Sequence, residues 1–93
     1  MIIEFSGDIW EWRGPAPFYF VTVPEEQSKE IKEMSRQLTY GWGMIPVEAT
    51  IGKTVWKTAL WEKVGLYVLP LKVVVRKDEE LEVRQLVAVK LEV

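Results

Sequence analysis

The sequence contains neither cysteine nor histidine, and these two absences exclude much of the usual catalytic and metal chemistry. Without cysteine the chain forms no disulfide framework and offers no thiolate ligand to zinc. Without histidine it lacks the commonest general base, so Ser6, Ser28 and Ser35 have no imidazole to activate them. The 14 Asp and Glu residues fall largely on positions expected to be solvated. We therefore expect a protein that is not an enzyme and that holds no metal and no cofactor.

Long apolar runs and an excess of one charge are also missing. No segment approaches the ~20 apolar residues of a membrane helix. The first five residues lack the basic region and the apolar stretch of a signal peptide. The net charge is −2 and the charges are interspersed, so the chain has no general attraction to nucleic acid or to an anionic membrane. We expect a cytoplasmic protein that does not enter a membrane.

Large apolar side chains are abundant in this short chain. Hydrophobic residues make up 48% and aromatic residues 12% of the 93 residues, with five Trp among them. A chain of this length fits one domain, residues 1–93, and needs large side chains to build a sufficient core. The composition therefore predicts a packed globule.

Residues 2–12 are expected to form a long strand whose apolar pattern changes parity. Trp10 and Trp12 stand on the face opposite to the preceding apolar residues, which are Ile3, Phe5 and Ile9. Because strand side chains alternate strictly, this change indicates a bulge or a strand that passes from one sheet to another. We place that point at Gly7–Asp8.

Five further segments have the apolar patterns of strands. Phe18–Val21 is apolar on both faces, whereas Ile45–Ile51 and Val87–Val93 alternate between apolar and polar residues. Gly52–Lys53 has the form of a two-residue hairpin turn. The expected strands after the first are 18–23, 45–51, 54–61, 66–70 and 87–93, which gives about six in all.

One clear helix is expected at residues 24–38. Pro24 suits the first turn, and the capping-box spacing of Thr22 and Glu25 supports the same start. The apolar face consists of Ile31, Met34 and Leu38, and Glu25 and Lys29 have the spacing of an ion pair. Gly41 is expected to end this helix. The segment 71–77 is ambiguous, because its three consecutive Val favour a strand while the preceding proline suits a helix start.

Three stretches carry a resemblance to a known family: "WRGPAPFYFVTVP", "GWGMIPVEATIGKTVWKTAL" and "GLYVLPLKVVVRK". Their order and spacing resemble a microbial family of small domains of unknown function, over residues 3–93. The pattern shared with that family runs Trp-x-Gly-x-x-Pro, then Ile-Gly-x-x-x-Trp-x-Thr, then Leu-Pro-x-Lys-x-x-x-Arg. Where relatives tend to have Gly-Asp before the last strand, this sequence has Arg84-Gln85, which leaves the tight turn there open.

Members of that family are similar in fold to the double-split β-barrel of the AbrB and MazE regulators. The resemblance implies a short helix near 71–77, despite the Val run. The fold class is therefore predicted to be mainly β: a double-split β-barrel-like domain with about six strands, a helix near 24–38 and a short helix near 71–77. A DNA-binding role follows from the fold only by analogy.

Two glycine-containing stretches imitate nucleotide-binding motifs. "IGKT" at 51–54 resembles the end of a phosphate loop, but the earlier glycine of that motif would fall at Val47. A hairpin turn explains it better. "GWG" at 41–43 is explained by a helix end followed by a loop.

Lys72, Arg76 and Lys77 form the one compact basic cluster of the sequence. On a short helix, Lys72 and Arg76 would share a face and could hold a phosphate or carboxylate. The alternative is that these side chains are solvated or pair with the nearby Glu79, Glu80 and Glu82. For a DNA partner, Lys53, Lys57 and Arg84 would extend the same surface.

The aromatic side chains are expected mainly inside the barrel. Phe5, Phe18, Phe20, Trp56 and Tyr67 are suited to fill its lumen. Trp10, Trp12, Trp42 and Trp61 are harder to bury together, because each indole N–H needs a partner. Trp42, between two glycines, is the best candidate for an exposed ring, and Trp12 is left open.

The sequence thus predicts a non-enzymatic binding or interaction domain. The candidate ligand-binding residues are Trp12, Trp42 and Trp56, with Lys72 and Arg76 as contacts for an anion. The expected partner is a small anionic ligand or another protein, bound by a monomer or a dimer. The alternative is a nucleic-acid-binding regulator, on the analogy with AbrB-like proteins.

Overall fold

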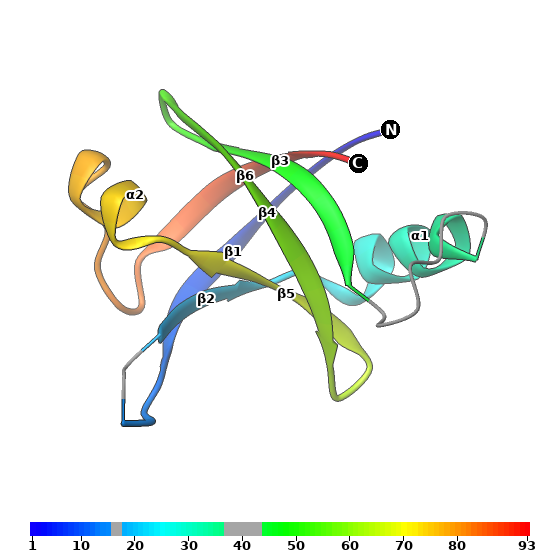
Figure 1. The fold of residues 1–93 in the computed structure, drawn as a ribbon, viewed down its shortest axis with the longest axis horizontal. Coiled ribbons are helices and arrows are strands. Elements are labelled where there is room, and N and C mark those ends of the chain that lie inside the picture. The colour runs from blue at the N-terminus through cyan, green and yellow to red at the C-terminus, as the bar shows by residue number, and fades with distance from the viewer. Residues whose placement is uncertain (16–17, 37–43) are drawn as a thin grey trace.

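Six antiparallel strands close into a barrel in the computed structural model, which describes residues 1–15, 18–36 and 44–93. The order around the barrel is β1-β2-β5-β4-β3-β6, and the two helices lie on opposite sides of it (Figure 1). The predicted mainly β barrel with one longer and one short helix is confirmed. In chain order the elements are β1 (Ile2–Trp12), β2 (Phe18–Thr22), α1 (Glu25–Ser35), β3 (Ile45–Ile51), β4 (Thr54–Lys63), β5 (Leu66–Leu71), α2 (Val73–Asp78) and β6 (Leu86–Glu92).

β1 is long enough to belong to two sheets. Its residues up to Asp8 pair with β6, and from Ile9 onward they pair with β2. The strands approach closely at Gly7, where a Cβ atom would lie 2.9 Å from Val21 Cγ1, so any side chain at this position would force its neighbours to shift. The predicted passage of the strand between sheets at Gly7–Asp8 is confirmed.

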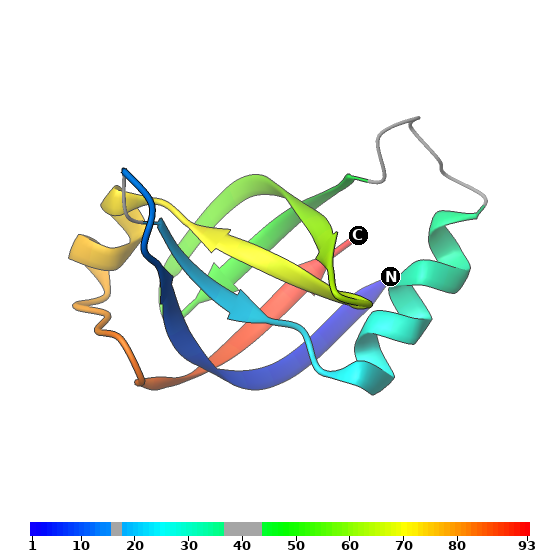
Figure 2. The same ribbon diagram turned by 90° about the horizontal axis from the view of Figure 1, so that it is seen from below.

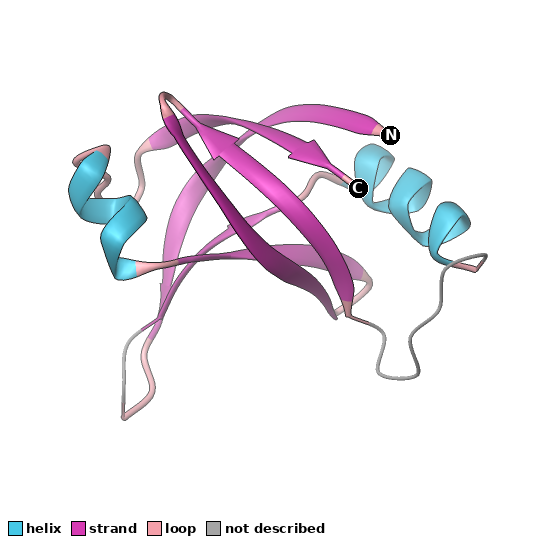
Figure 3. Cartoon of the chain, turned by 45° about the horizontal axis from the view of Figure 1, so that its top comes forward, coloured by secondary structure: helices cyan, strands magenta, loops and turns pink. Residues whose placement is uncertain are grey.

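β4 makes a corresponding passage. It pairs with β3 up to Leu60 and with β5 from Trp61 onward. The barrel therefore consists of sheet A (β1, β6, β3 and β4) and sheet B (β1, β2, β5 and β4), which share their long strands (Figure 3). Figure 2 shows β2 and β5 of sheet B from outside the barrel.

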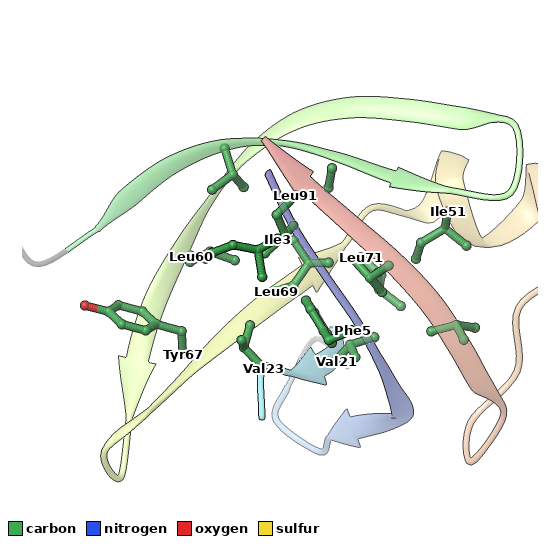
Figure 4. Close-up of a cluster of buried hydrophobic side chains, with 14 of the residues drawn as sticks. Ile3, Phe5, Val21, Val23, Ile51, Leu60, Tyr67, Leu69, Leu71 and Leu91 are labelled. Carbon is green, nitrogen blue, oxygen red and sulfur yellow. The ribbon is translucent and has the colours of Figure 1, made fainter. Parts of the chain in front are cut away.

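Alternate residues of every strand point into the barrel and form one core, part of which is shown in Figure 4. Ile31 of α1 and Val75 of α2 join the same cluster, so each helix covers one end of the barrel. The strand residues of this core are Ile3, Phe5, Ile9, Val21, Ile45, Val47, Ala49, Ile51, Trp56, Leu60, Tyr67, Leu69, Leu71, Val87, Val89 and Leu91.

The prediction that Phe18 and Phe20 fill the lumen is wrong. Val21 belongs to the core, and Phe20 has the opposite parity on β2, so its ring lies outside the barrel. The sequence of β2 is apolar on both faces, and only the tertiary structure decides which face is inward. Phe5, Trp56 and Tyr67 occupy the lumen as predicted.

α1 begins at Glu25, one residue after the predicted start, with Pro24 as the residue that precedes it. Glu25 and Lys29 form the expected ion pair at 3.3 Å. The predicted capping box is wrong, since no side chain caps this helix and the Thr22 hydroxyl instead accepts a hydrogen bond from Trp10 Nε1. The described helix ends at Ser35, short of the predicted 38. Leu38 and Gly41 lie outside the described residues.

α2 confirms that the Val run is helical, over Val73–Asp78 rather than 71–77. Lys72 is the extended residue that precedes it. The turn left open before the last strand is present and places Arg84 at φ 72°, in the left-handed region. Its backbone N–H donates to Ile9 O at 2.7 Å, which ties the turn to β1. The similarity to the AbrB-type double-split barrel stays a prediction.

Candidate functional site

The two sheets of the barrel have very different outer faces. The outward residues of sheet A are mostly polar, and they include Glu4, Ser6, Glu48, Thr50, Lys57, Lys90 and Glu92. The outward residues of sheet B include five aromatic side chains, which are Trp10, Trp12, Phe18, Phe20 and Trp61. An outer face with many exposed aromatic rings is typical of interaction sites, since such rings do not fill a core.

Strand pairing brings these rings together in rows across sheet B. Trp12 lies opposite Phe18, and Trp10 lies opposite Phe20. The following row crosses from Thr22 through Val68 to Trp61. Side chains at paired positions share one face of a sheet, so three strands and the end of β4 build one continuous surface.

The rings pack against one another around Phe20. The centroid of Phe20 lies 4.9 Å from that of Trp10 and 5.3 Å from that of Trp61, which meets it edge to face. Phe20 is only 5% exposed although it lies outside the lumen. It is therefore the centre of a second, smaller hydrophobic cluster, and the neighbouring rings cover it.

The outer members of this cluster remain open to solvent. Trp12 is 44% exposed, Phe18 53% and Trp61 36%. Together with the buried ring they enclose a groove of about 320 Å³, which we call the aromatic groove; it is lined by Trp10, Trp12, Phe18, Phe20, Trp61 and Lys63. Its volume is at the small end of the roughly 300–1,000 Å³ of small-molecule sites.

Trp10 and Lys63 are fixed by specific contacts. The Trp10 indole N–H donates to Thr22 Oγ1 at 2.8 Å, so this ring is held in place on the sheet. The Lys63 ammonium lies 4.6 Å from the centroid of the same ring, a cation–π contact. The aromatic groove thus has one anchored indole with a positive charge above it.

The predicted site residues are only partly brought together. Trp12 lines the aromatic groove, whereas Trp56 faces the lumen, where its Nε1 has no hydrogen-bond partner among the described residues. Trp42 lies outside the described residues. Lys72 is the exposed residue between β5 and α2, and it is not among the residues that line the aromatic groove.

Arg76 lies elsewhere, at the end of the barrel that α2 covers. Its guanidinium carbon is 3.7 Å from the centroid of the Tyr19 ring, and its Nε is buried without a partner among the described residues. The nearby Glu79 accepts hydrogen bonds from the Thr54 hydroxyl at 2.7 Å and from the Lys53 backbone N–H at 3.4 Å. This carboxylate therefore ties α2 to the β3–β4 hairpin.

Sequence reasoning missed most of the aromatic groove, namely Trp10, Phe18, Phe20, Trp61 and Lys63. A signal was available in the parity of β1 and β4. Trp10 follows the inward Ile9, and Trp61 follows the inward Leu60. β2 gives no such signal, because both of its faces are apolar.

Other features of the described residues give less indication of a functional site than the aromatic groove does. A second groove, of about 530 Å³, crosses the polar outer face of sheet A and is lined in part by Glu4, Ser6, Thr50 and Lys90. Among residues 1–15, 18–36 and 44–93, no three acidic side chains are grouped to hold a metal ion. Neither α1 nor α2 is long and apolar enough to cross a membrane.

Comparison with protein families gives a match over most of the chain. Residues 5–91 match the model of a family described as "Domain of unknown function (DUF1905)". The match spans nearly the whole chain and confirms the resemblance to a family of small domains of unknown function. No curated protein matches the chain.

Proposed function

We propose that this chain, which belongs to the DUF1905 family of domains of unknown function, is a non-enzymatic binding domain whose ligand occupies the aromatic groove. The observation that carries the proposal is the exposure of Trp12, Phe18 and Trp61 on one outer face of a barrel. The proposal keeps the cytoplasmic location expected from the sequence.

Packing of the core does not account for these rings. The lumen is already filled by residues of all six strands and closed by Ile31 and Val75. Solvation of three large rings is unfavourable by roughly 25 cal/mol for each Å² of apolar surface. A ligand that covers the rings would recover part of this free energy.

The side chains of the aromatic groove suit binding rather than catalysis. Five are Trp or Phe and the sixth is Lys63, so these six carry no carboxylate, imidazole or hydroxyl group. Acid–base and nucleophilic catalysis mostly depend on such groups. The lining therefore supports recognition without a chemical step.

The proposal is tested by following the five Trp indole N–H signals in an NMR titration with naphthaleneethanol, an uncharged planar probe. We expect shifts of the Trp10, Trp12 and Trp61 signals, while the signal of Trp56, inside the barrel, stays in place. Trp12→Ser should weaken binding about fivefold or more, since one stacked ring contributes roughly 1–3 kcal/mol.

Val55→Ser is the matched control, because Val55 is an exposed apolar residue on the outer face of sheet A. It should leave the titration unchanged. The proposal is overturned if neither this probe nor its charged analogues described below moves the groove signals. A parallel titration with duplex DNA that shifts only residues outside the aromatic groove would instead favour the nucleic-acid alternative.

A further inference from the structure

We infer that the aromatic groove selects a planar aromatic ligand that carries a negatively charged group, which the Lys63 ammonium binds. The inference rests on the proposed function and adds the chemical class of the ligand. Three observations carry it: the polar atoms of the lining side chains are all hydrogen-bond donors, the Lys63 ammonium forms no ion pair with the described residues, and the aromatic groove has the size of one ring system.

The polar atoms of the lining side chains are all hydrogen-bond donors. Indoles offer N–H groups and Lys63 offers an ammonium, whereas none of the six side chains has an acceptor oxygen. The Trp10 N–H is already used by Thr22. Among the described residues, the indole N–H groups of Trp12 and Trp61 have no partner. A ligand with acceptor oxygens complements this set, and an anion does so best.

Lys63 is available to such a ligand. None of the ion pairs formed by the described residues involves Lys63, whereas Lys29 and Lys32 each pair with a glutamate. Its ammonium is held over the Trp10 ring at 4.6 Å, and this contact leaves its N–H donors free to bind an anion. The charge is thus kept at the rim of an apolar groove, next to where a ligand ring would stack.

The chemistry of the aromatic groove argues against two other ligand classes. A cationic ligand would compete with Lys63 for the Trp10 face and would be repelled by it. A sugar needs acceptors as well as donors for its hydroxyl groups, and these six side chains supply donors alone. At about 320 Å³ the aromatic groove also has room for one ring system rather than for an extended chain.

The experiment compares one ring system with different charges: naphthaleneacetate, naphthyl phosphate, naphthaleneethanol and naphthaleneethylamine. We measure the Kd of each from the indole N–H signals at low ionic strength. The two anions should bind about fivefold or more tightly than the alcohol, and the amine should bind more weakly than the alcohol. The carboxylate and phosphate arms distinguish an aromatic acid from a nucleotide-like ligand.

Lys63→Met is the decisive variant, because it keeps the length of the side chain and removes its charge. It should abolish the preference for the anions and leave the Kd of the alcohol nearly unchanged. Lys57→Met is the matched control, since Lys57 is an exposed lysine on the same strand, over sheet A. It should preserve the preference.

The possible outcomes separate the two proposals. If the alcohol binds and the anions bind no more tightly, the inference about the ligand is overturned while the proposed function stands. Tighter binding of the amine overturns it in the same way. If none of the four compounds shifts the groove signals, both proposals fall.

Discussion

At the scale of single residues, the aromatic groove depends on how its polar atoms are satisfied. Trp10 is the only one of its three indoles whose N–H is bonded within the described structure, at 2.8 Å to Thr22. The Thr22 hydroxyl was expected to cap α1. It instead accepts the hydrogen bond from Trp10 and so orients that ring of the aromatic groove. Trp10 is therefore the fixed part of the aromatic groove, on which Lys63 rests.

Thr22→Val tests this contact, because it removes the acceptor and keeps the shape of the side chain. We expect a loss of about 0.5–1.5 kcal/mol in the free energy of unfolding, the usual contribution of one hydrogen bond. The Trp10 indole signal should also move. Thr50→Val serves as the control, since the half-buried Thr50 makes no side-chain hydrogen bond within the described residues. Equal stability losses in denaturant unfolding would contradict the assignment.

At the scale of elements, each helix is attached to the barrel by a polar contact beside an apolar one. α1 inserts Ile31 into the core, and its buried Ser28 donates to Val23 O at 2.9 Å and accepts from the Tyr67 N–H at 3.1 Å. One hydroxyl therefore joins the helix to the end of β2 and to β5. α2 inserts Val75 and uses Glu79 for the corresponding contact with the β3–β4 hairpin.

Ser28→Ala should lower the stability of the fold strongly, although it removes only one hydroxyl group. It leaves the Tyr67 N–H and the Val23 carbonyl buried without this partner, and we expect a loss of about 1–3 kcal/mol in the free energy of unfolding. Ser35→Ala, in the same helix, should cost less than about 1 kcal/mol, because its hydroxyl only donates to Lys32 O within the helix. Chemical denaturation of both variants checks this order, and a reversed order would refute the role given to Ser28.

At the scale of the whole molecule, closure of the barrel separates stability from recognition. A closed barrel pairs its strands all the way round, so among the described strands none is left as a free edge to which a partner could add another strand. In the function we propose, binding uses side chains on the outer faces. Sheet A offers a polar face and sheet B the aromatic groove, while the lumen provides the stability.

Leu60 and Trp61 test this separation, because they are neighbours on β4 with opposite orientations. Leu60→Ala should lower the free energy of unfolding by about 2–5 kcal/mol, as is typical of a buried leucine, and leave the naphthaleneacetate Kd of the folded protein unchanged. Trp61→Ser should cost less than about 2 kcal/mol and weaken binding severalfold. Thermal unfolding and the same titration measure both effects. Loss of binding in the Leu60 variant alone would refute the separation.

The sequence by itself located the six strands and the longer helix of this protein, whereas its apolar pattern left residues 71–77 ambiguous between strand and helix. Alternating apolar residues located the strands, and the change of parity after Ile9 located the passage of β1 between sheets. The absence of cysteine and histidine also showed that no thiolate or imidazole group is present to act as a catalytic group or a metal ligand. These properties are local, because they follow from side-chain periodicity and from which functional groups are present.

Only the tertiary structure decided which apolar face became the core. β2 is apolar on both faces, so its own pattern does not determine whether Phe20 or Val21 points into the lumen. Barrel closure turns Val21 inward and aligns Phe20 with Trp10 and Trp61, residues far apart in the chain. The aromatic groove arises from strand order and register, and for that physical reason no single segment predicts it.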